Sequence, residues 1–487
     1  MASKDKGAKT ASADKKGSKA EAPAKKPADG LYRIPRESGW ARAAQYSAVL
    51  AVVGLVLSLV AWNSDSHRFA FSWLFAIMSV LAVGLGSLFL VVVQHITMSG
   101  WSVVIRRTSE TFASGLQIFA VFVVPLMFMH MDDLYPWMHY WRESAEQHSG
   151  EAEHEDAAAA EEGEGHSRLD EGLVGASVAH AQEHDRGEPA EVEHGEGGHE
   201  EHTPEHHAHE ETIQAKLGYL NQPFFLGRMF FYLAVWALLS WYFHSNSLKQ
   251  DTTKDRQITN RLNKAAPVSL FAFAITLTFA AFDWMMSLEP TWFSTIFGVQ
   301  YFAVSCVSAL ATLVLVTHLL RNAGLLGNAV STEHFHDVGK LLFGFLVFWA
   351  YITFSQFMLI WYASIPEETT YYHLRFSGGW RTFSWFLLIC HFFVPFFGIL
   401  SRNIKRRVPL LALGAGWLLV MHVLEVYWLV MPYTNGGVAL TPHWMDGAAL
   451  FAVGGAYLAF VFFRMSQSPL IPVGDPRLSS SLHHEVT

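Results

Sequence analysis

The sequence predicts an all-α integral membrane protein of about ten transmembrane helices. Hydrophobic residues make up 51% of the chain and charged residues only 16%, a composition typical of membrane proteins. Apolar runs of roughly 20 residues, long enough to cross a hydrocarbon layer of about 30 Å, recur along the sequence. Lys and Arg are concentrated on alternate connecting segments, as expected for repeated membrane crossings. The net charge of −9 is gathered in the tails and one loop, so it indicates no nucleic-acid partner. The apolar runs make a lipid bilayer the expected partner.

The apolar runs place the membrane spans. We expect helices at residues 43–62, 70–93, 112–131, 224–243, 268–286, 296–320, 341–362, 382–400, 410–430 and 445–463. They divide the chain into a disordered basic cytoplasmic tail (1–42), helices 1–3 (43–131), an acidic His-rich extracytoplasmic loop (132–222), helices 4–10 (223–464) and a cytoplasmic tail (465–487). Residues 1–30 lack the apolar core of a signal peptide.

The basic residues indicate the orientation. Of the 34 Lys and Arg residues, 26 lie in the two tails and in every second connecting segment, and 8 lie in the other segments. Because Lys and Arg are retained on the cytoplasmic side, this asymmetry places both termini in the cytoplasm.

The loop at 132–222 differs from every other connection. It contains 12 histidines between His139 and His209, among many carboxylates. Two interpretations remain open, a zinc or copper buffer and a solvated acidic insertion. No spacing in it is typical of a closed tetrahedral site, so we expect no defined metal centre.

The two central spans are joined by a short polar hairpin at residues 287–294. Pro290 cannot donate a backbone hydrogen bond and disfavours helical backbone at Glu289, so the first helix should end near Leu288. Asp283 lies before that end, inside the membrane. Because an ionisable side chain is costly there, Asp283 is a candidate functional residue that faces the bundle interior or water.

Six polar residues lie within about nine residues of the extracytoplasmic ends of their helices: Asp283, Gln300, Gln356, His391, His422 and Glu425. At helical rise this is a depth of roughly 14 Å, so we expect one polar layer. His391 and His422 should face each other from consecutive helices, with Glu425 on the face of His422. Asp283, His391, His422 and Glu425 are therefore candidates for a proton relay or for accepting a quinol proton.

Two other interpretations of this layer remain open. The residues can serve only to brace helices, or His391 and His422 can ligate a haem. The haem interpretation is weak because the histidines of the other spans are single and scattered. Cys306 and Cys390 are isolated in apolar spans, without the spacing of a covalent haem or a cluster. We expect no haem, iron–sulfur cluster or metal site in this chain.

Two groups remain near helix ends. At the cytoplasmic ends we expect solvated interface residues: Gln94, His95, Glu110, His318, His334, His336, Asp337 and Lys340. Near the outer end of the third helix lie His130, Asp132 and Asp133. A quinone site needs such a proton acceptor beside an apolar slot. His130 and Asp132, with Gln300 and Gln356, are therefore the candidates for a quinone site or for the polar layer.

Three stretches resemble a known family. They are SLEPTWFSTIFGVQYFA (287–303), KLLFGFLVFWAYITFSQFMLIWYASIPEETTYY (340–372) and the final hairpin around MPYTNGG (431–437). They look like the NrfD-like membrane subunits (polysulfide reductase NrfD family) of bacterial alternative complex III. The resemblance covers nearly all of the membrane region, but neither the tails nor the His-rich loop.

The resemblance implies two four-helix bundles, helices 2–5 and 6–9, flanked by helices 1 and 10. It implies a quinol:electron-acceptor oxidoreductase in the bacterial cytoplasmic (inner) membrane, with cytochrome c or a copper protein as acceptor and menaquinone or ubiquinone as cofactor. The implied partners are a multihaem cytochrome c, an iron–sulfur subunit, a paralogous NrfD-like subunit and, in some assemblies, a terminal oxidase. In such complexes the paralogous subunit is the better-supported quinol site, and chains like this one serve proton conduction and assembly.

Two alternatives to this respiratory function remain open. A proton- or metal-coupled carrier would use the His-rich loop as a collector, although carriers often have helices broken at the midplane and the central spans here are largely unbroken. A purely structural scaffold subunit would use the buried polar residues only for packing.

Overall fold

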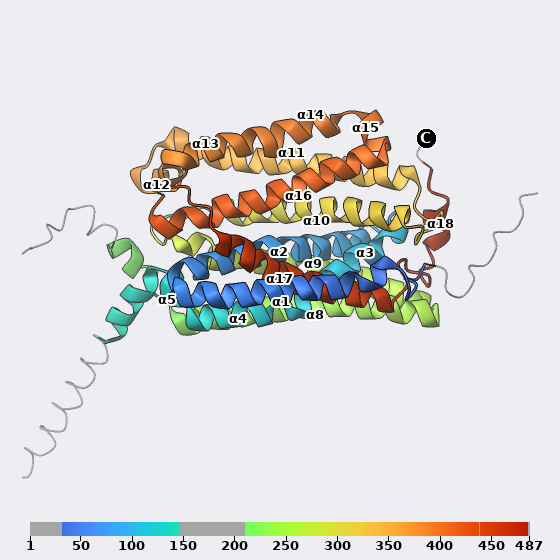
Figure 1. Cartoon of the computed structure of the whole chain (residues 1–487), viewed down its shortest axis with the longest axis horizontal. Helices are drawn as coiled ribbons and strands as arrows, with labels where there is room; N and C mark the ends of the chain where they lie inside the picture. The colour runs from blue at the N-terminus through green and yellow to red at the C-terminus, as the bar shows by residue number, and fades with distance from the viewer. Residues whose placement is uncertain (1–31, 147–209, 438, 486–487) are drawn as a thin grey trace, which may run out of the picture. The chain divides into compact units, whose positions relative to one another are not determined.

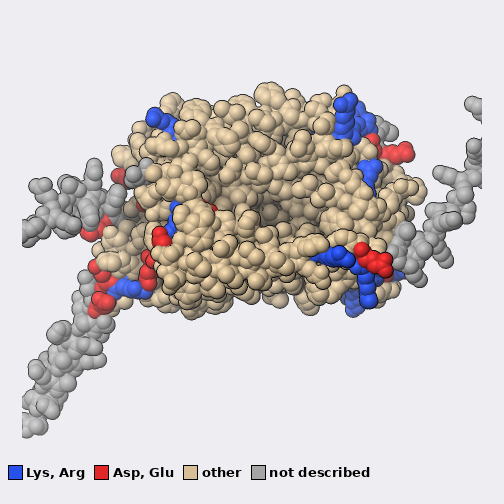
Figure 2. Space-filling view, in the orientation of Figure 1, with Lys and Arg blue, Asp and Glu red and all other residues tan. Residues whose placement is uncertain are grey.

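The computed structural model describes residues 32–146, 210–437 and 439–485. In these ranges the chain is helical, with connecting turns and no β-strand (Figure 1). Within these described residues, ten helices are long and apolar enough to cross a membrane, which confirms the prediction of an all-α, multi-pass membrane protein. Lys, Arg, Asp and Glu gather at the two ends of the visible face, with an uncharged band between them (Figure 2).

Several of the ten spans consist of more than one helical segment. In chain order the segments are α1 (Ala43–Ser64), α2 (Ser66–Ile96), α3 (Val103–Ser114), η2 (Gly115–Ile118), α4 (Ala120–Met129), α8 (Gln222–Thr253), α9 (Arg256–Trp284), η3 (Met286–Leu288), α10 (Phe297–Asn322), α11 (Thr332–Ala363), α13 (Gly378–Leu387), η4 (Leu388–Phe393), α14 (Val394–Leu400), α16 (Val408–Val430), η5 (Met431–Asn435) and α17 (Trp444–Gln467).

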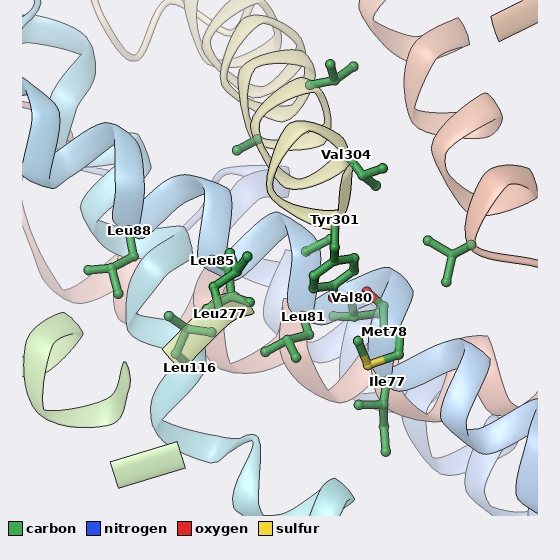
Figure 3. Packing of buried hydrophobic residues seen from close by; sticks show 14 of the residues in the cluster. Ile77, Met78, Val80, Leu81, Leu85, Leu88, Leu116, Leu277, Tyr301 and Val304 are labelled. Carbon is green, nitrogen blue, oxygen red and sulfur yellow. Dashed lines mark hydrogen bonds between the residues drawn. The ribbon is translucent and has the colours of Figure 1, made fainter. Parts of the chain in front are cut away.

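The core lies where α2 packs against α10. Both helices are buried along most of their length and contact each other extensively. Leu81 and Leu85 of α2 lie among Tyr301 of α10, Leu277 of α9 and Leu116 of η2 (Figure 3). A Cβ added at Gly86 would clash with the backbone of α10, so the small residue permits the close approach of the two helices.

The remaining helices pack around this pair. α3 and α9 each contact both α2 and α8, while α10 also contacts α11 and α16. α1 packs mainly against α17, where Gly54 and Gly455 allow close contact between the two backbones. The rest of the α1 surface is apolar and exposed, which suits a helix surrounded by lipid.

The two ends of the helix bundle are formed by different segments. At the terminal end, the Leu470 N–H donates to the Tyr32 carbonyl at 2.7 Å, so the N- and C-terminal segments meet. The opposite, hairpin end carries α5 (Met131–Leu134), η3 and α12 (Pro366–Arg375). The helix before Pro290 continues to Leu288 as η3, as predicted.

Parts of three regions predicted as tails or loop are instead packed onto the helices. Residues 32–42 include the buried Ile34, and Trp40 packs edge-on against Phe462. After α17 the chain buries Ile471 and runs into α18 (Leu478–Leu482). The described flanks of the 132–222 loop are also folded, with Trp137 fully buried. Apolar residues within polar stretches therefore anchor these segments. Residues 147–209, which contain most of the histidines of the His-rich loop, lie outside the described residues.

Candidate functional site

The most unusual group in the membrane interior is formed by His391, Glu425 and Trp349. The His391 Nδ1 lies 3.3 Å from the Glu425 Oε2, and both side chains are almost fully buried. The Trp349 Nε1–H donates to the other Glu425 oxygen at 2.5 Å. The Trp349 and His391 rings stack with centroids 4.1 Å apart. One indole from α11 therefore positions both titratable groups, which come from η4 and α16.

A local distortion of the helix places His391 in this group. Residues Leu388–Phe393 form a π-helical turn, η4, between α13 and α14. Pro395 follows and has no N–H to donate to the His391 carbonyl four residues earlier, which removes one α-helical hydrogen bond. Such single π-turns often occur at functional positions.

His422 lies one turn before Glu425 but has a different neighbour. Its Nε2–H donates to the Ser79 carbonyl of α2 at 2.9 Å. Its Nδ1 and the Nε2 of His391 have no hydrogen-bond partner among the described residues. Among the described residues no hydrogen bond joins His391 to His422; His391 contacts Glu425, and His422 lies one turn before Glu425 on α16. Imidazole and carboxyl groups that retain free hydrogen-bonding positions can exchange protons through water.

Both candidate glutamines are buried. Gln356 lies two helical turns after Trp349 on α11, and Gln300 lies in the first turns of α10. The Oε1 atom of each lacks a hydrogen-bond partner among the described residues. They are available to water or ligand, but no hydrogen bond in the described part of the chain joins either of them to Glu425.

Asp283 belongs to a separate, saturated group. Its carboxylate accepts from the Arg228 guanidinium at 2.8 and 3.0 Å, from the Tyr219 hydroxyl at 2.9 Å and from the Tyr232 hydroxyl at 2.8 Å. The Ser287 hydroxyl bonds to its backbone carbonyl. The four predicted relay residues thus do not form one hydrogen-bonded layer. A carboxylate held by an arginine and two tyrosines is typical of a structural ion pair.

His130 and Asp132 lie at the hairpin end beside a cleft of about 380 Å³. His130 Nδ1 lies 2.8 Å from Asp133 Oδ2, and the ring is enclosed by Trp62 and Phe69. The exposed Asp132 carboxylate accepts from Arg142 at 2.7 Å. Both aspartates line the cleft, whereas His130 contacts it only through Asp133. The cleft is also lined by His67, Phe71, Leu134, Pro136, Leu288, Glu289, Leu374, Tyr433 and Gly436.

A buried network of charges near the terminal end was not predicted from the sequence. Arg106 bonds Glu110 at 2.9 Å and Asp475 at 2.7 Å, while Arg107 contacts Glu110 at 3.0 Å and Asp251 at 2.7 Å. The expectation that Glu110 is a solvated interface residue is therefore wrong. The spacing of Arg106 and Arg107 before Glu110, four and three residues, was the available clue, because such pairs share one helix face.

Four other residues assigned to solvated helix ends are also enclosed: His95, His334, His336 and Asp337. Gln94 and His318 are partly buried, and Lys340 is exposed, as expected. His484 of the C-terminal segment bonds to Asp337 at 2.6 Å. The C-terminal segment covers the helix end at His334 and Asp337, whereas His95 is enclosed by Asn263 of α9 and Phe243 of α8.

No group of three or more His, Cys, Asp or Glu side chains in the described ranges is arranged to hold a metal ion. Comparison with known proteins does not identify a relative, since no protein-family model matches the sequence and no curated protein matches it significantly.

Proposed function

We propose that this chain is an integral membrane subunit of a quinol:electron-acceptor oxidoreductase complex and that His391 and Glu425, with His422 beside them, move protons there. The observation that supports this proposal most strongly is that the Glu425 carboxyl and the His391 imidazole lie 3.3 Å apart in the membrane interior, both in contact with Trp349. Ionisable residues are costly in a membrane and usually mark ion or proton pathways.

The proposal assigns no redox metal to this chain. Electron transfer falls to a multihaem cytochrome c and an iron–sulfur protein, and a paralogous NrfD-like subunit is the further membrane partner. The support for these partners is the resemblance of residues 287–303, 340–372 and 431–437 to the NrfD-like subunits of alternative complex III. Menaquinol or ubiquinol is the proposed substrate of the assembly. A quinol headgroup bound to this chain would meet Asp132 and Asp133 in the hairpin-end cleft, and Gln300 and Gln356 are the buried polar groups available deeper in the membrane.

The arrangement of the helices and their orientation are part of the proposal. We infer two four-helix bundles, α2 to α9 and α10 to α16: contacts of α2 with α3 and α9, and of α10 with α11 and α16, support this division, and the extensive α2–α10 contact would join the two bundles. We also infer that the terminal end faces the cytoplasm of a bacterium, because 26 of the 34 Lys and Arg residues lie in segments assigned to that side.

Purification separates this proposal from a carrier. The affinity-tagged chain, extracted in mild detergent, is expected to bring down haem-containing partners in fixed proportion. A proton- or metal-coupled carrier would instead be recovered alone or as a homo-oligomer, and its recovery without haem absorption from a membrane that oxidises quinol would contradict the proposal.

Turnover separates proton movement from a scaffold. Glu425→Gln keeps the shape and a hydrogen-bond acceptor for Trp349 but removes the titratable group. We expect normal assembly and quinol oxidation at least about tenfold slower, equivalent to about 1.4 kcal/mol on the limiting barrier. Glu367→Gln, at an exposed glutamate of α12, is the matched control and should leave turnover unchanged. Wild-type turnover in both variants would leave the buried residues only a structural role.

A further inference from the structure

Arg375, the last residue of α12, is fully buried, and no carboxylate in the described part of the chain lies within ion-pair distance of its guanidinium. The guanidinium donates to the Tyr371 carbonyl at 2.9 Å, to the Leu429 carbonyl at 2.9 Å and to the Tyr433 hydroxyl at 3.4 Å. Its Nε has no hydrogen-bond partner among the described residues. No carboxylate of the described residues therefore neutralises the charge, and its hydrogen-bond acceptors are uncharged carbonyl and hydroxyl groups.

The other two fully buried arginines are not held in this way. Arg106 contacts Glu110 and Asp475, and Arg107 contacts Glu110 and Asp251. Placing an unpaired charge in a low-dielectric interior is costly, and a guanidinium does not lose its proton at physiological pH. The fixed, unpaired positive charge of Arg375 is therefore costly, and the place where it lies in the protein indicates what it does.

Aromatic rings hold Arg375 in place. Its guanidinium carbon lies 3.6 Å from the centre of the Tyr371 ring, 4.9 Å from that of Trp428 and 5.1 Å from that of Tyr433. The Trp292 ring stacks on Tyr371 at 4.1 Å. Cation–π contacts of this kind offset part of the desolvation cost and leave the charge itself unneutralised.

Arg375 lies between the buried His391–Glu425 pair and the hairpin-end cleft. Leu429, whose carbonyl it bonds, lies one helical turn after Glu425 on α16, a rise of about 6 Å. On the other side, Tyr433 lines the cleft.

We propose that Arg375, held by Tyr371 and Tyr433, is a gate that keeps protons from passing freely between the cleft and the Glu425 site. The inference rests on the proposed function, because it assigns a barrier to that same site. A guanidinium cannot relay a proton, and its fixed charge repels a proton that approaches from either side. Passage then requires the cluster to shift, which couples proton movement to the rest of the complex.

Passive proton permeability tests the gate without quinol turnover. The full chain, within its purified assembly, is reconstituted into liposomes that contain a pH-sensitive dye, and a potassium diffusion potential drives proton entry. Arg375→Gln should raise the initial proton flux per complex at least about tenfold, since it removes a unit charge from a low-dielectric passage. Arg375→Lys keeps the charge and should retain most of the block.

Three comparisons make the test specific. Arg381→Gln, at an exposed arginine of α13, should match the wild type. The double variant Arg375→Gln/Glu425→Gln should return the flux to the wild-type level, because both residues lie on one path. If Arg375→Gln does not accumulate, Tyr433→Phe removes the hydroxyl that holds the guanidinium and should raise the flux by about threefold.

Two results would overturn the gate. One is an unchanged proton flux in Arg375→Gln, or in Tyr433→Phe if Arg375→Gln does not accumulate. The other is a leak that persists in the double variant Arg375→Gln/Glu425→Gln. The proposed function is judged separately by the turnover of Glu425→Gln alone. A leak in Arg375→Gln combined with normal turnover in Glu425→Gln would retain the gate and reject proton movement as the role of Glu425 in quinol oxidation.

Discussion

Asp475 is expected to stabilise the terminal end of the protein through buried charge. Its carboxylate is enclosed and accepts from Arg106 at 2.7 Å and from Arg477 at 3.1 Å. Replacement by Asn keeps the size but removes the charge. Breaking a buried ion pair by removing one partner typically costs about 3–5 kcal/mol of unfolding free energy. We expect about 3 kcal/mol, the low end of that range, because Arg106 keeps Glu110 at 2.9 Å.

The free energy of unfolding of Asp475→Asn can be measured by SDS titration in mixed micelles. The matched control is Asp255→Asn, at the same end of the protein, where the side chain caps α9 and Asn caps a helix equally well. A loss below about 0.5 kcal/mol in Asp475→Asn, similar to that of a surface substitution, would refute the view that the C-terminal segment is held by this network.

Three further predictions concern the buried charges and Trp349. The stability difference between wild type and Asp475→Asn should depend on pH. Burial alone would raise the pKa of Asp475, but Arg106 and Arg477 outweigh this effect and hold the pKa well below its usual range. The stabilisation by the Asp475 carboxylate should therefore be complete above about pH 5 and shrink as the pH falls below about 4, and a difference that grows with acid would contradict the assignment. Asp283→Asn should destabilise the protein by about 3–5 kcal/mol, because it leaves the Arg228 guanidinium unpaired. The yield of monodisperse protein after mild heating measures this loss, and a normal yield would show that the ion pair is dispensable. Trp349→Phe keeps an aromatic ring against His391 but removes the N–H that bonds Glu425; quinol oxidation should fall about tenfold at normal complex yield, and unchanged turnover would remove Trp349 from the site.

The sequence alone predicted the number and approximate positions of the spans, because hydropathy is a local property of each segment. It underestimated helix lengths where polar turns continue a helix beyond the apolar run. The fifth span, for example, was expected at residues 268–286, whereas α9 begins at Arg256. Pro290 marked the end of that helix correctly, since its effect on the backbone is also local.

Contacts between helices were harder to predict. Counting residues from helix ends gave the depth of His391, Glu425 and Asp283 but not the rotation of each helix. Depth alone therefore grouped Asp283 with the other two, whereas in the structure it faces Arg228 of α8. The π-turn that reorients His391 depends on a hydrogen bond missing at Pro395, and a periodicity of 3.6 residues does not reveal it.

The charge network around Arg106 could not be predicted from polarity alone. Each member taken singly is typical of a solvated helix end, and only tertiary packing brings Asp251 and Asp475 to the arginines. The same is true of Arg375, which lies in the polar connection between the spans expected at residues 341–362 and 382–400 and is fully buried.

Proton release per quinol oxidised, measured in liposomes that contain the purified assembly, tests the central proposal most directly. A membrane-impermeant pH dye and a quinol assay in the same sample give the ratio for wild type, Glu425→Gln and the control Glu367→Gln. If the His391–Glu425 pair moves protons, the ratio or the turnover of Glu425→Gln falls, whereas Glu367→Gln behaves as wild type. Wild-type proton release and wild-type turnover in Glu425→Gln, at normal assembly, would contradict the proposal.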